Sequence, residues 1–234
     1  MTEWFHTFDD GLWLRPDDVG GAEATFIKKA LRLRKGWRVL DAPCGAGRIT
    51  VHLAKAGCLV TGIDLRPQFI RRARARFRKA GVAGTFRAMD LRELNFENEF
   101  HGICNWQGSF GYFSAEENAD LVRCYARALR KGGRLLIDQV NREFVLRHFR
   151  PKQEAEGVTM CNRWNAAEQR IESTWITTRG ARPRNPLSIR IYTPGQMRRL
   201  FERAGLKVTR TYGSFLGERH GRGTTRMIMV GKKR

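Results

Sequence analysis

The sequence predicts an α/β fold with a doubly wound, mainly parallel sheet and helices on both faces of that sheet. Two observations lead to this prediction. Between residues 36 and 150, short apolar segments alternate with amphipathic segments of helical period. Three of the apolar segments end in an aspartate, at Asp41, Asp64 and Asp90. Because crossover connections bring the carboxyl ends of parallel strands to one edge of a sheet, we expect these acids to lie together there.

Local signals mark the individual elements. Gly57 closes one helical segment, and Pro67 opens the next. Ser114 and Glu117 form a capping box for a third helix, which the pair Gly132-Gly133 is expected to stop. The predicted strands cover residues 37–41, 58–64, 85–90, 102–106 and 134–138, and the predicted helices cover residues 22–34, 48–56, 67–79, 114–130 and 141–149.

The C-terminal part of the chain departs from this alternation. Segments 157–164, 169–178 and 187–192 resemble strands separated by polar turns, so we expect an antiparallel cap over the ligand site. A second capping box at Thr193 opens a helix, after which two β segments form a C-terminal antiparallel hairpin. We therefore expect one domain over 1–234, composed of an N-terminal helical segment 1–35, a ligand-binding core 36–150, a β-rich cap insert 151–191, and a helix and hairpin 192–234.

Composition narrows the class of protein. The formal net charge is +21, and arginine supplies most of the positive charge. Arginine recognises phosphates, but these residues are spread along the chain, which favours solvated faces over a nucleic-acid site. Five cysteines without a CxxC pair or a zinc-like spacing to histidine indicate reduced thiols and no metal site. No apolar run approaches the roughly 18–20 residues that span a bilayer, and no signal peptide is evident, so we expect a cytoplasmic protein.

The turn from Asp41 to Arg48 lies between a predicted strand and a predicted helix. Its glycines, Gly45 and Gly47, allow a ligand to approach the backbone, and the helix that follows offers free N–H groups. The dinucleotide fingerprint that begins at Gly45 requires a third glycine where Thr50 stands, so the turn does not favour NAD. A carboxylate at the end of the second strand, here Asp64, is suited to accept the hydroxyls of a ribose.

Several segments together resemble the methyltransferase-domain family of class I S-adenosylmethionine-dependent enzymes. They cover most of residues 37–149, and the C-terminal helix and hairpin are similar as well. Proline at position 43 departs from the family pattern, which has the first glycine of a three-glycine turn there. The segments are RVLDAPCGAGR, VTGIDLRP, FRAMDL, NWQGSFGYF, LRKGGRLLIDQVNRE, YTPGQMRRLFERAG and MIMVGKK.

The resemblance implies a Rossmann-like fold and a site for S-adenosyl-L-methionine, which becomes S-adenosyl-L-homocysteine after transfer. It places the first turn beside the methionine moiety, Asp64 on the ribose with Leu65 against the adenine, and Asp90 at the adenine amino group. Arg48 is either a surface cation or a ligand of the cofactor carboxylate. The full predicted set is Asp41, Ala42, Pro43, Gly45, Gly47, Arg48, Asp64, Leu65, Met89, Asp90, Leu91, Asn105, Trp106 and Gln107.

The acceptor is less defined by the sequence than the cofactor. The chain is expected to be a methyltransferase of class EC 2.1.1 that acts on a nitrogen, oxygen or carbon atom, most simply of a small molecule, as a monomer or homodimer. An RNA methyltransferase and a non-catalytic nucleic-acid-binding protein on the same fold are the alternatives. Methyl transfer needs a base only when the acceptor must lose a proton early. Tyr192 and His220 are the tentative catalytic residues, and Tyr112, Asp138 and His148 are weaker candidates.

Overall fold

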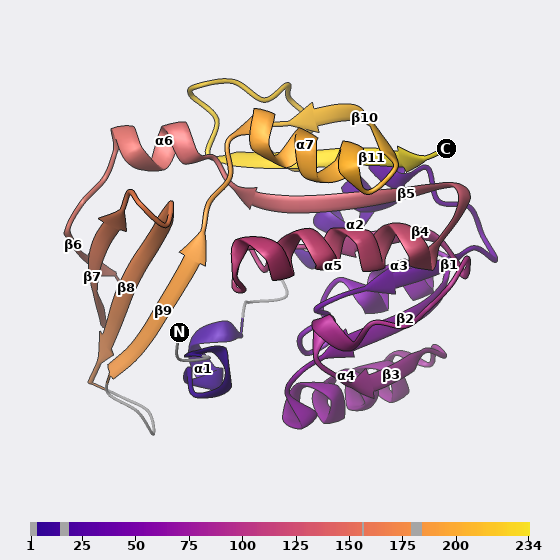
Figure 1. Ribbon diagram of the computed structural model, residues 1–234. Coiled ribbons are helices and arrows are strands. Elements are labelled where there is room, and N and C mark those ends of the chain that lie inside the picture. The colour runs from indigo at the N-terminus through magenta and orange to yellow at the C-terminus, as the bar shows by residue number, and fades with distance from the viewer. Residues whose placement is uncertain (1–3, 15–18, 156, 179–183) are drawn as a thin grey trace.

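The larger sheet carries the predicted alternation of strands and helices. The computed structural model describes residues 4–14, 19–155, 157–178 and 184–234. The sheet has seven strands, in the order β10-β11-β5-β4-β1-β2-β3 (Figure 1). Strands β1 to β5 pair in parallel, whereas β10 and β11 form the C-terminal hairpin, and β11 pairs antiparallel with β5. The strands are β1 (Arg38–Asp41), β2 (Leu59–Asp64), β3 (Thr85–Ala88), β4 (Phe100–Asn105), β5 (Leu129–Val140), β10 (Leu206–Tyr212) and β11 (Arg226–Lys233).

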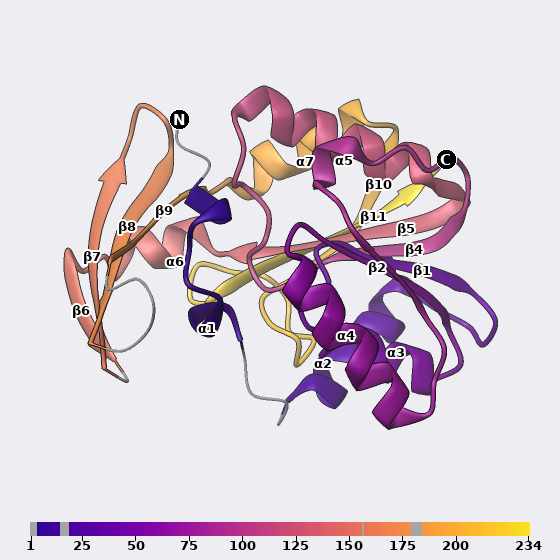
Figure 2. The same ribbon diagram turned by 90° about the horizontal axis from the view of Figure 1, so that it is seen from below.

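Helices cover both faces of this sheet, as the sequence predicts (Figure 2). One face carries α2 (Gly20–Leu31), α3 (Thr50–Lys55) and α4 (Pro67–Ala80), and the other carries α5 (Ala115–Ala128) and α7 (Pro194–Arg203). Each face has its own apolar cluster of buried side chains. Both predicted capping boxes are present, at the starts of α5 and α7.

The end of α5 differs from the prediction. The helix stops at Ala128, two residues before the expected end, because Leu129 is already extended and pairs with Phe100 of β4. The glycine pair therefore lies within β5 instead of terminating the helix. A Cβ atom at Gly133 would lie 3.0 Å from the Phe100 carbonyl oxygen, so the close approach of the two strands explains this glycine.

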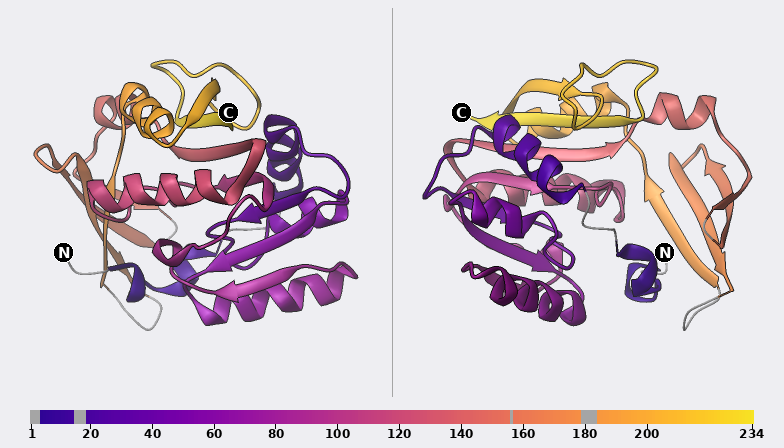
Figure 3. Two further views of the ribbon diagram at one scale, coloured as in Figure 1. Left: turned by 45° about the vertical axis from the view of Figure 1, so that its right-hand side comes forward. Right: turned by 180° about the vertical axis from the view of Figure 1, so that it is seen from behind.

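The insert forms a separate antiparallel sheet, hereafter the insert sheet, in the order β6-β7-β8-β9. It lies beyond the carboxyl ends of the parallel strands, on the side where a cap was expected (Figure 3). The sequence did not predict β6, because its side chains are all exposed and show no apolar alternation. The insert strands are β6 (Lys152–Ala155), β7 (Val158–Asn165), β8 (Arg170–Thr177) and β9 (Arg184–Arg190), and α6 (Arg142–Arg147) connects β5 to them.

Residues 4–14 form a strap between the insert sheet and the larger sheet (Figures 1 and 2). Only the short segments η1 (Trp4–His6) and α1 (Asp10–Trp13) of this strap are helical, and the helix predicted over residues 22–34 follows as α2. The Trp4 indole N–H donates to the Ser188 carbonyl oxygen of β9 at 3.0 Å. The strap is thereby fixed to the insert sheet.

The capping box of α5 gives a test of local stability. Replacing Ser114 by Ala is expected to lower the free energy of unfolding by about 1 kcal/mol, because the amide of Glu117 loses its side-chain acceptor. Chemical denaturation measures the change. Glu117→Gln retains a side-chain acceptor for the Ser114 amide and is the control. It should lower the free energy of unfolding by only a few tenths of the loss expected for Ser114→Ala. Equal losses in the two variants would contradict the capping role of the serine.

Candidate functional site

A pocket opens at the carboxyl ends of the parallel strands. It encloses about 1260 Å³ of space free of protein atoms, part of it open solvent. Five parts of the chain form its walls: the first turn after β1, the ends of β2 and β3, helix α4, the loop after β4, and the strap. The predicted site residues that line it are Asp41, Pro43, Gly45, Arg48, Asp64, Leu65, Asp90, Leu91, Trp106 and Gln107.

The first turn has the open backbone that a bound ligand requires. Gly45 has φ +52°, and a Cβ atom built there would meet nothing within 4 Å, so the glycine leaves space beside the pocket. Gly47 has φ +75° and serves packing instead, because its Cβ would lie 3.0 Å from that of Ala73 on α4. Pro43 is accommodated in this turn, after a cis peptide bond, and lines the pocket.

Asp41 lies below the turn with its carboxylate buried. It accepts a 2.6 Å hydrogen bond from the Thr50 hydroxyl at the start of α3 and a 3.5 Å contact from the Cys104 thiol. Burial raises the pKa of Asp41 to about 6, although both of these donors oppose the rise. The carboxylate therefore changes its charge near neutral pH in the protein without a ligand.

Asp64 joins the first two strand ends. One carboxylate oxygen accepts the Gly45 amide and the other accepts the Arg66 amide, each at 2.9 Å. Burial raises the pKa of Asp64 in spite of these two hydrogen bonds. Each carboxylate oxygen has a second lone-pair direction, so the group retains the capacity to accept ligand hydroxyls.

Asp90 is engaged more strongly by the protein than the sequence suggested. Both carboxylate oxygens accept hydrogen bonds from the Arg92 guanidinium, and one also caps the short helix η2 (Leu91–Glu93). Burial tends to raise the pKa of Asp90, but the hydrogen bonds and charge of Arg92 outweigh it and lower the pKa. Asp90 is thus an ionised hydrogen-bond acceptor at the edge of the pocket.

Arg48 lies inside the protein rather than on its surface. It is 8% exposed, and one guanidinium nitrogen lies 2.5 Å from the Glu23 carboxylate of α2. Glu23 also accepts the Trp106 indole N–H at 3.2 Å, which joins α2 to the end of β4. The Nη2 atom of Arg48 is buried and has no hydrogen-bond partner among the residues that the structure describes. A buried guanidinium with free donors beside a pocket is suited to hold an anionic group.

Four predicted residues act behind the pocket wall. Gly47 packs on α4, and Met89 packs against the apolar cluster on the α5 side. Ala42 and Asn105 are fully buried, and the Asn105 amide donates to the Ala42 carbonyl oxygen at 3.0 Å. These residues hold the strand ends rather than face the pocket.

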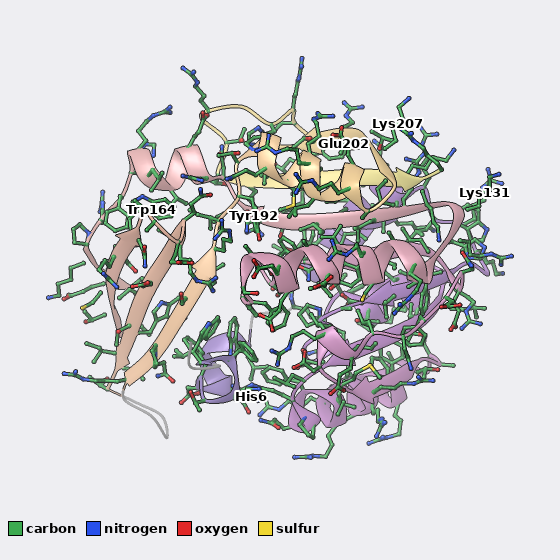
Figure 4. The ribbon with its side chains drawn as sticks, in the orientation of Figure 1. His6, Lys131, Trp164, Tyr192, Glu202 and Lys207 are labelled. Carbon is green, nitrogen blue, oxygen red and sulfur yellow. The ribbon has the colours of Figure 1, made fainter. Side chains whose placement is uncertain are left out.

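The two tentative catalytic residues do not line the pocket. Tyr192 packs against Phe110, and its hydroxyl is buried. Figure 4 shows Tyr192 near the carboxyl end of β5, well separated from His6 of the strap. His220 lies in the loop between β10 and β11 with its Nε2 atom buried. Asp138 is also buried, where it pairs with Arg226 and accepts the Gln107 amide. Of the weaker candidates, Tyr112 alone lines the pocket.

The main contribution that sequence reasoning missed is the strap. Its residues Phe5, Trp13 and Leu14 line the pocket, together with Tyr112 and Phe113 of the loop after β4. No residue of the insert sheet, among those described, lines the pocket. The signal available in the sequence was the density of aromatic residues between positions 4 and 13, which follows no helical or strand period.

The comparisons in sequence cover part of the chain. Residues 39–133 match a family described as a methyltransferase domain. A ubiquinone biosynthesis O-methyltransferase from Xanthomonas euvesicatoria is 31% identical over 114 residues, which cover 46% of this chain and 44% of that protein. The chain therefore spans less than half the length of the curated relatives it matches.

Solved structures share nearly the whole architecture. The CcbJ methyltransferase from Streptomyces caelestis superposes with a TM-score of 0.79 at 16% identity, over 94% of this chain and 99% of that one. An S-adenosylmethionine-dependent methyltransferase from Clostridium acetobutylicum superposes with a TM-score of 0.75 at 17% identity, over 91% of each chain. Residues 39–133 thus match the methyltransferase-domain family, and the chain shares its fold with S-adenosylmethionine-dependent methyltransferases.

Proposed function

We propose that this protein binds S-adenosylmethionine in the pocket and transfers its methyl group to a small molecule. The observation that carries the proposal is the juxtaposition of three features on one pocket wall: the open turn at Gly45, the Asp64 carboxylate, and the buried Arg48 guanidinium. They match the backbone, ribose and carboxylate contacts that such a cofactor needs. In this assignment Leu65 and Leu91 lie against the adenine, and Asp90 accepts its amino group.

Arg48 provides the test of fit that is specific to this chain. Its Nη2 atom is buried and no described residue accepts a hydrogen bond from it, which costs free energy unless a ligand provides the acceptor. The methionyl carboxylate of the cofactor is an anion that satisfies such a donor. Glu23 holds the guanidinium from the opposite side at 2.5 Å. We therefore assign Arg48 to the cofactor carboxylate and Glu23 to its positioning.

The bound cofactor would supply a sulfonium methyl group that is displaced in line by the acceptor. The protein contributes alignment and the exclusion of water. Asp138 accepts the Gln107 amide at 2.8 Å and so fixes the loop after β4, where Gln107 has φ +59°. The strap roofs the pocket with Phe5 and Trp13. We assign no catalytic base.

The roof favours a small acceptor over RNA. The strap is attached on both sides, to the insert sheet through Trp4 and to the loop after β2 through Arg66, whose guanidinium donates to the Phe5 and Phe8 carbonyl oxygens. A polynucleotide needs an open groove, whereas this pocket lies under a fixed segment. The relative in ubiquinone biosynthesis supports the same choice.

The carboxylate assignment predicts a loss of discrimination in Arg48→Gln. The wild-type protein should bind S-adenosylhomocysteine more tightly than 5′-methylthioadenosine, which lacks the amino-acid end. The variant should lose about 1.5–3 kcal/mol of affinity for the former, the usual contribution of a hydrogen bond to a charged group. Its affinity for 5′-methylthioadenosine should stay unchanged. Titration calorimetry measures all four constants.

A control and a contrary result define this test further. Asp64→Asn should weaken both nucleosides alike, because both carry the ribose. If the wild-type protein binds NAD tightly and neither nucleoside measurably, the proposed cofactor is wrong. If Arg48→Gln weakens both nucleosides equally, Arg48 is structural and does not meet the carboxylate.

Asp41 should make binding of the amino-acid end depend on pH. Its pKa of about 6 means that the carboxylate is mostly protonated at pH 5 and mostly ionised at pH 7. The ammonium group of S-adenosylhomocysteine favours the ionised form, so its affinity should rise by up to about tenfold over this interval and then level off. Calorimetry from pH 5 to 8 follows the rise. Affinity for 5′-methylthioadenosine should stay flat, and a rise that persists in Asp41→Asn would assign the titration to another group.

Transfer of label from methyl-tritiated S-adenosylmethionine tests the class of acceptor. Incubated with fractionated bacterial extracts, the protein should label the small-molecule fraction and leave the RNA fraction at background. The Arg48→Gln variant should transfer less label at low cofactor concentration. Label found in RNA that resists removal by small-molecule filtration would favour the RNA methyltransferase alternative instead.

A further inference from the structure

The loop after β4 is held in an unusual way. It links Gln107 to the start of α5 and contributes Ser109, Tyr112 and Phe113 to the pocket wall. The carbonyl groups of its residues 111–113 accept hydrogen bonds from residues distant in the sequence. The insert sheet supplies the chief donor.

That donor is Arg170 of β8, which is 1% exposed and the largest fully buried side chain described. Its Nη1 atom donates to the Phe113 carbonyl oxygen at 2.9 Å. Its Nη2 atom donates to the Tyr112 carbonyl oxygen at 2.9 Å and, more weakly, to that of Gly111 at 3.3 Å. One guanidinium therefore binds three consecutive carbonyl groups of the loop.

The other side of Arg170 is anchored on the neighbouring strand β9. Its Nε atom donates to the Ser188 hydroxyl at 2.7 Å, and Nη2 also reaches the Ser188 carbonyl oxygen at 2.8 Å. Among the residues that the structure describes, no carboxylate forms an ion pair with this guanidinium, so its charge is balanced chiefly by carbonyl dipoles. Such a buried charge is tolerated only while these acceptors stay in place. Because the buried guanidinium needs these acceptors, movement of the loop carbonyl groups costs free energy.

The backbone of β9 also binds the loop, at Gly111. The Arg190 amide donates to the Gly111 carbonyl oxygen at 2.8 Å. Gly111 has φ +104°, and a Cβ atom there would lie 2.1 Å from the Arg190 carbonyl oxygen, so only glycine permits this approach. The insert sheet thus contacts the loop through both a side chain and a strand backbone.

The pocket side of the loop meets the strap. Tyr112 packs edge-on against Trp4 with ring centroids 4.9 Å apart, and Phe113 packs edge-on against Phe5 at 5.5 Å. The position of the loop therefore sets both the wall and the attachment of the roof. A displacement of its carbonyl groups would move these rings with them.

We propose that Arg170 is a positioning residue of the site: it holds residues 111–113 so that Tyr112 and Phe113 close the pocket and support the strap. The insert then acts on the site chiefly through its contacts with this loop, of which those of Arg170 are the most numerous. This inference rests on the proposed function for its consequence in ligand binding, but the clamp itself is a property of the fold.

Arg170→Lys in the full chain tests the proposal. A lysine keeps the charge but replaces the planar fork with a single ammonium, which cannot reproduce the set of carbonyl contacts. Hydrogen exchange should become about tenfold faster or more in a peptide covering 109–114, because hydrogen bonds to a buried charged group are lost. Exchange in the turn 41–50 should not change, and the dissociation constant for S-adenosylhomocysteine should rise several-fold.

Arg163→Lys is the matched control, because Arg163 belongs to the same sheet but is exposed and pairs with Glu172 at the surface. It should leave both exchange and affinity unchanged. If Arg170→Lys does not fold, Ser188→Ala removes only the acceptor of Nε and should give a smaller acceleration confined to the same peptide.

Three results would overturn the proposal. If exchange in 109–114 equals that of the wild type in both Arg170→Lys and Ser188→Ala, Arg170 does not hold the loop. If exchange in 41–50 accelerates equally, Arg170 contributes to the stability of the whole fold and not to the position of the loop in particular. A local acceleration with unchanged affinity for S-adenosylhomocysteine would deny it a role in the site. If the wild type does not bind that nucleoside, the proposed function fails, and the exchange data still decide whether the clamp exists.

Discussion

The hydrogen bond from the Gly45 amide to the Asp64 carboxylate joins the first two strand ends, and the rest of the site is built on that junction. The same carboxylate accepts the Arg66 amide, and the Arg66 guanidinium holds the strap through the Phe5 and Phe8 carbonyl oxygens. The first turn and the strap, which line the pocket from two parts of the chain, therefore both depend on the short segment Asp64–Arg66. A buried carboxylate is suited to this place because it binds two backbone amides and still has acceptor capacity for a ligand.

The part of the site that was predictable from the sequence is the part that local rules determine. Asp41 and Asp64 end their strands, and Gly45 occupies a turn position with positive φ. Each of these features depends on a few neighbouring residues, and the parallel sheet brings them to one edge. The strap follows no such rule. Its aromatic residues match no period, and their positions depend on contacts with segments more than a hundred residues away, such as that of Trp4 with Ser188.

The same distinction explains the other differences from the sequence predictions. Tyr192 and His220 follow or precede strands as catalytic residues often do, but only tertiary packing decides whether such a side chain faces a pocket. Tyr192 packs into the core against Phe110. The insert lies at the expected edge, yet the strap occupies the position between it and the pocket. A long segment inserted after β5 predicts proximity to the site, and proximity does not determine which residues form the wall.

The distribution of arginine contacts bears on the meaning of the +21 charge. Several of these side chains donate to main-chain carbonyl groups, and among those that follow Arg170 is buried whereas Arg74 and Arg127 are exposed: Arg66 binds those of the strap, Arg74 that of Phe86, Arg76 that of Ala46, Arg127 that of Leu94, and Arg170 those of the loop after β4. A guanidinium has five donors in a planar fork and can join several carbonyl groups where a lysine reaches fewer. An arginine that is buried as well as engaged, as Arg170 is, is not free to neutralise phosphates. The charge of the chain thus reflects in part how its loops are fastened, and a high net charge alone does not indicate a nucleic-acid partner.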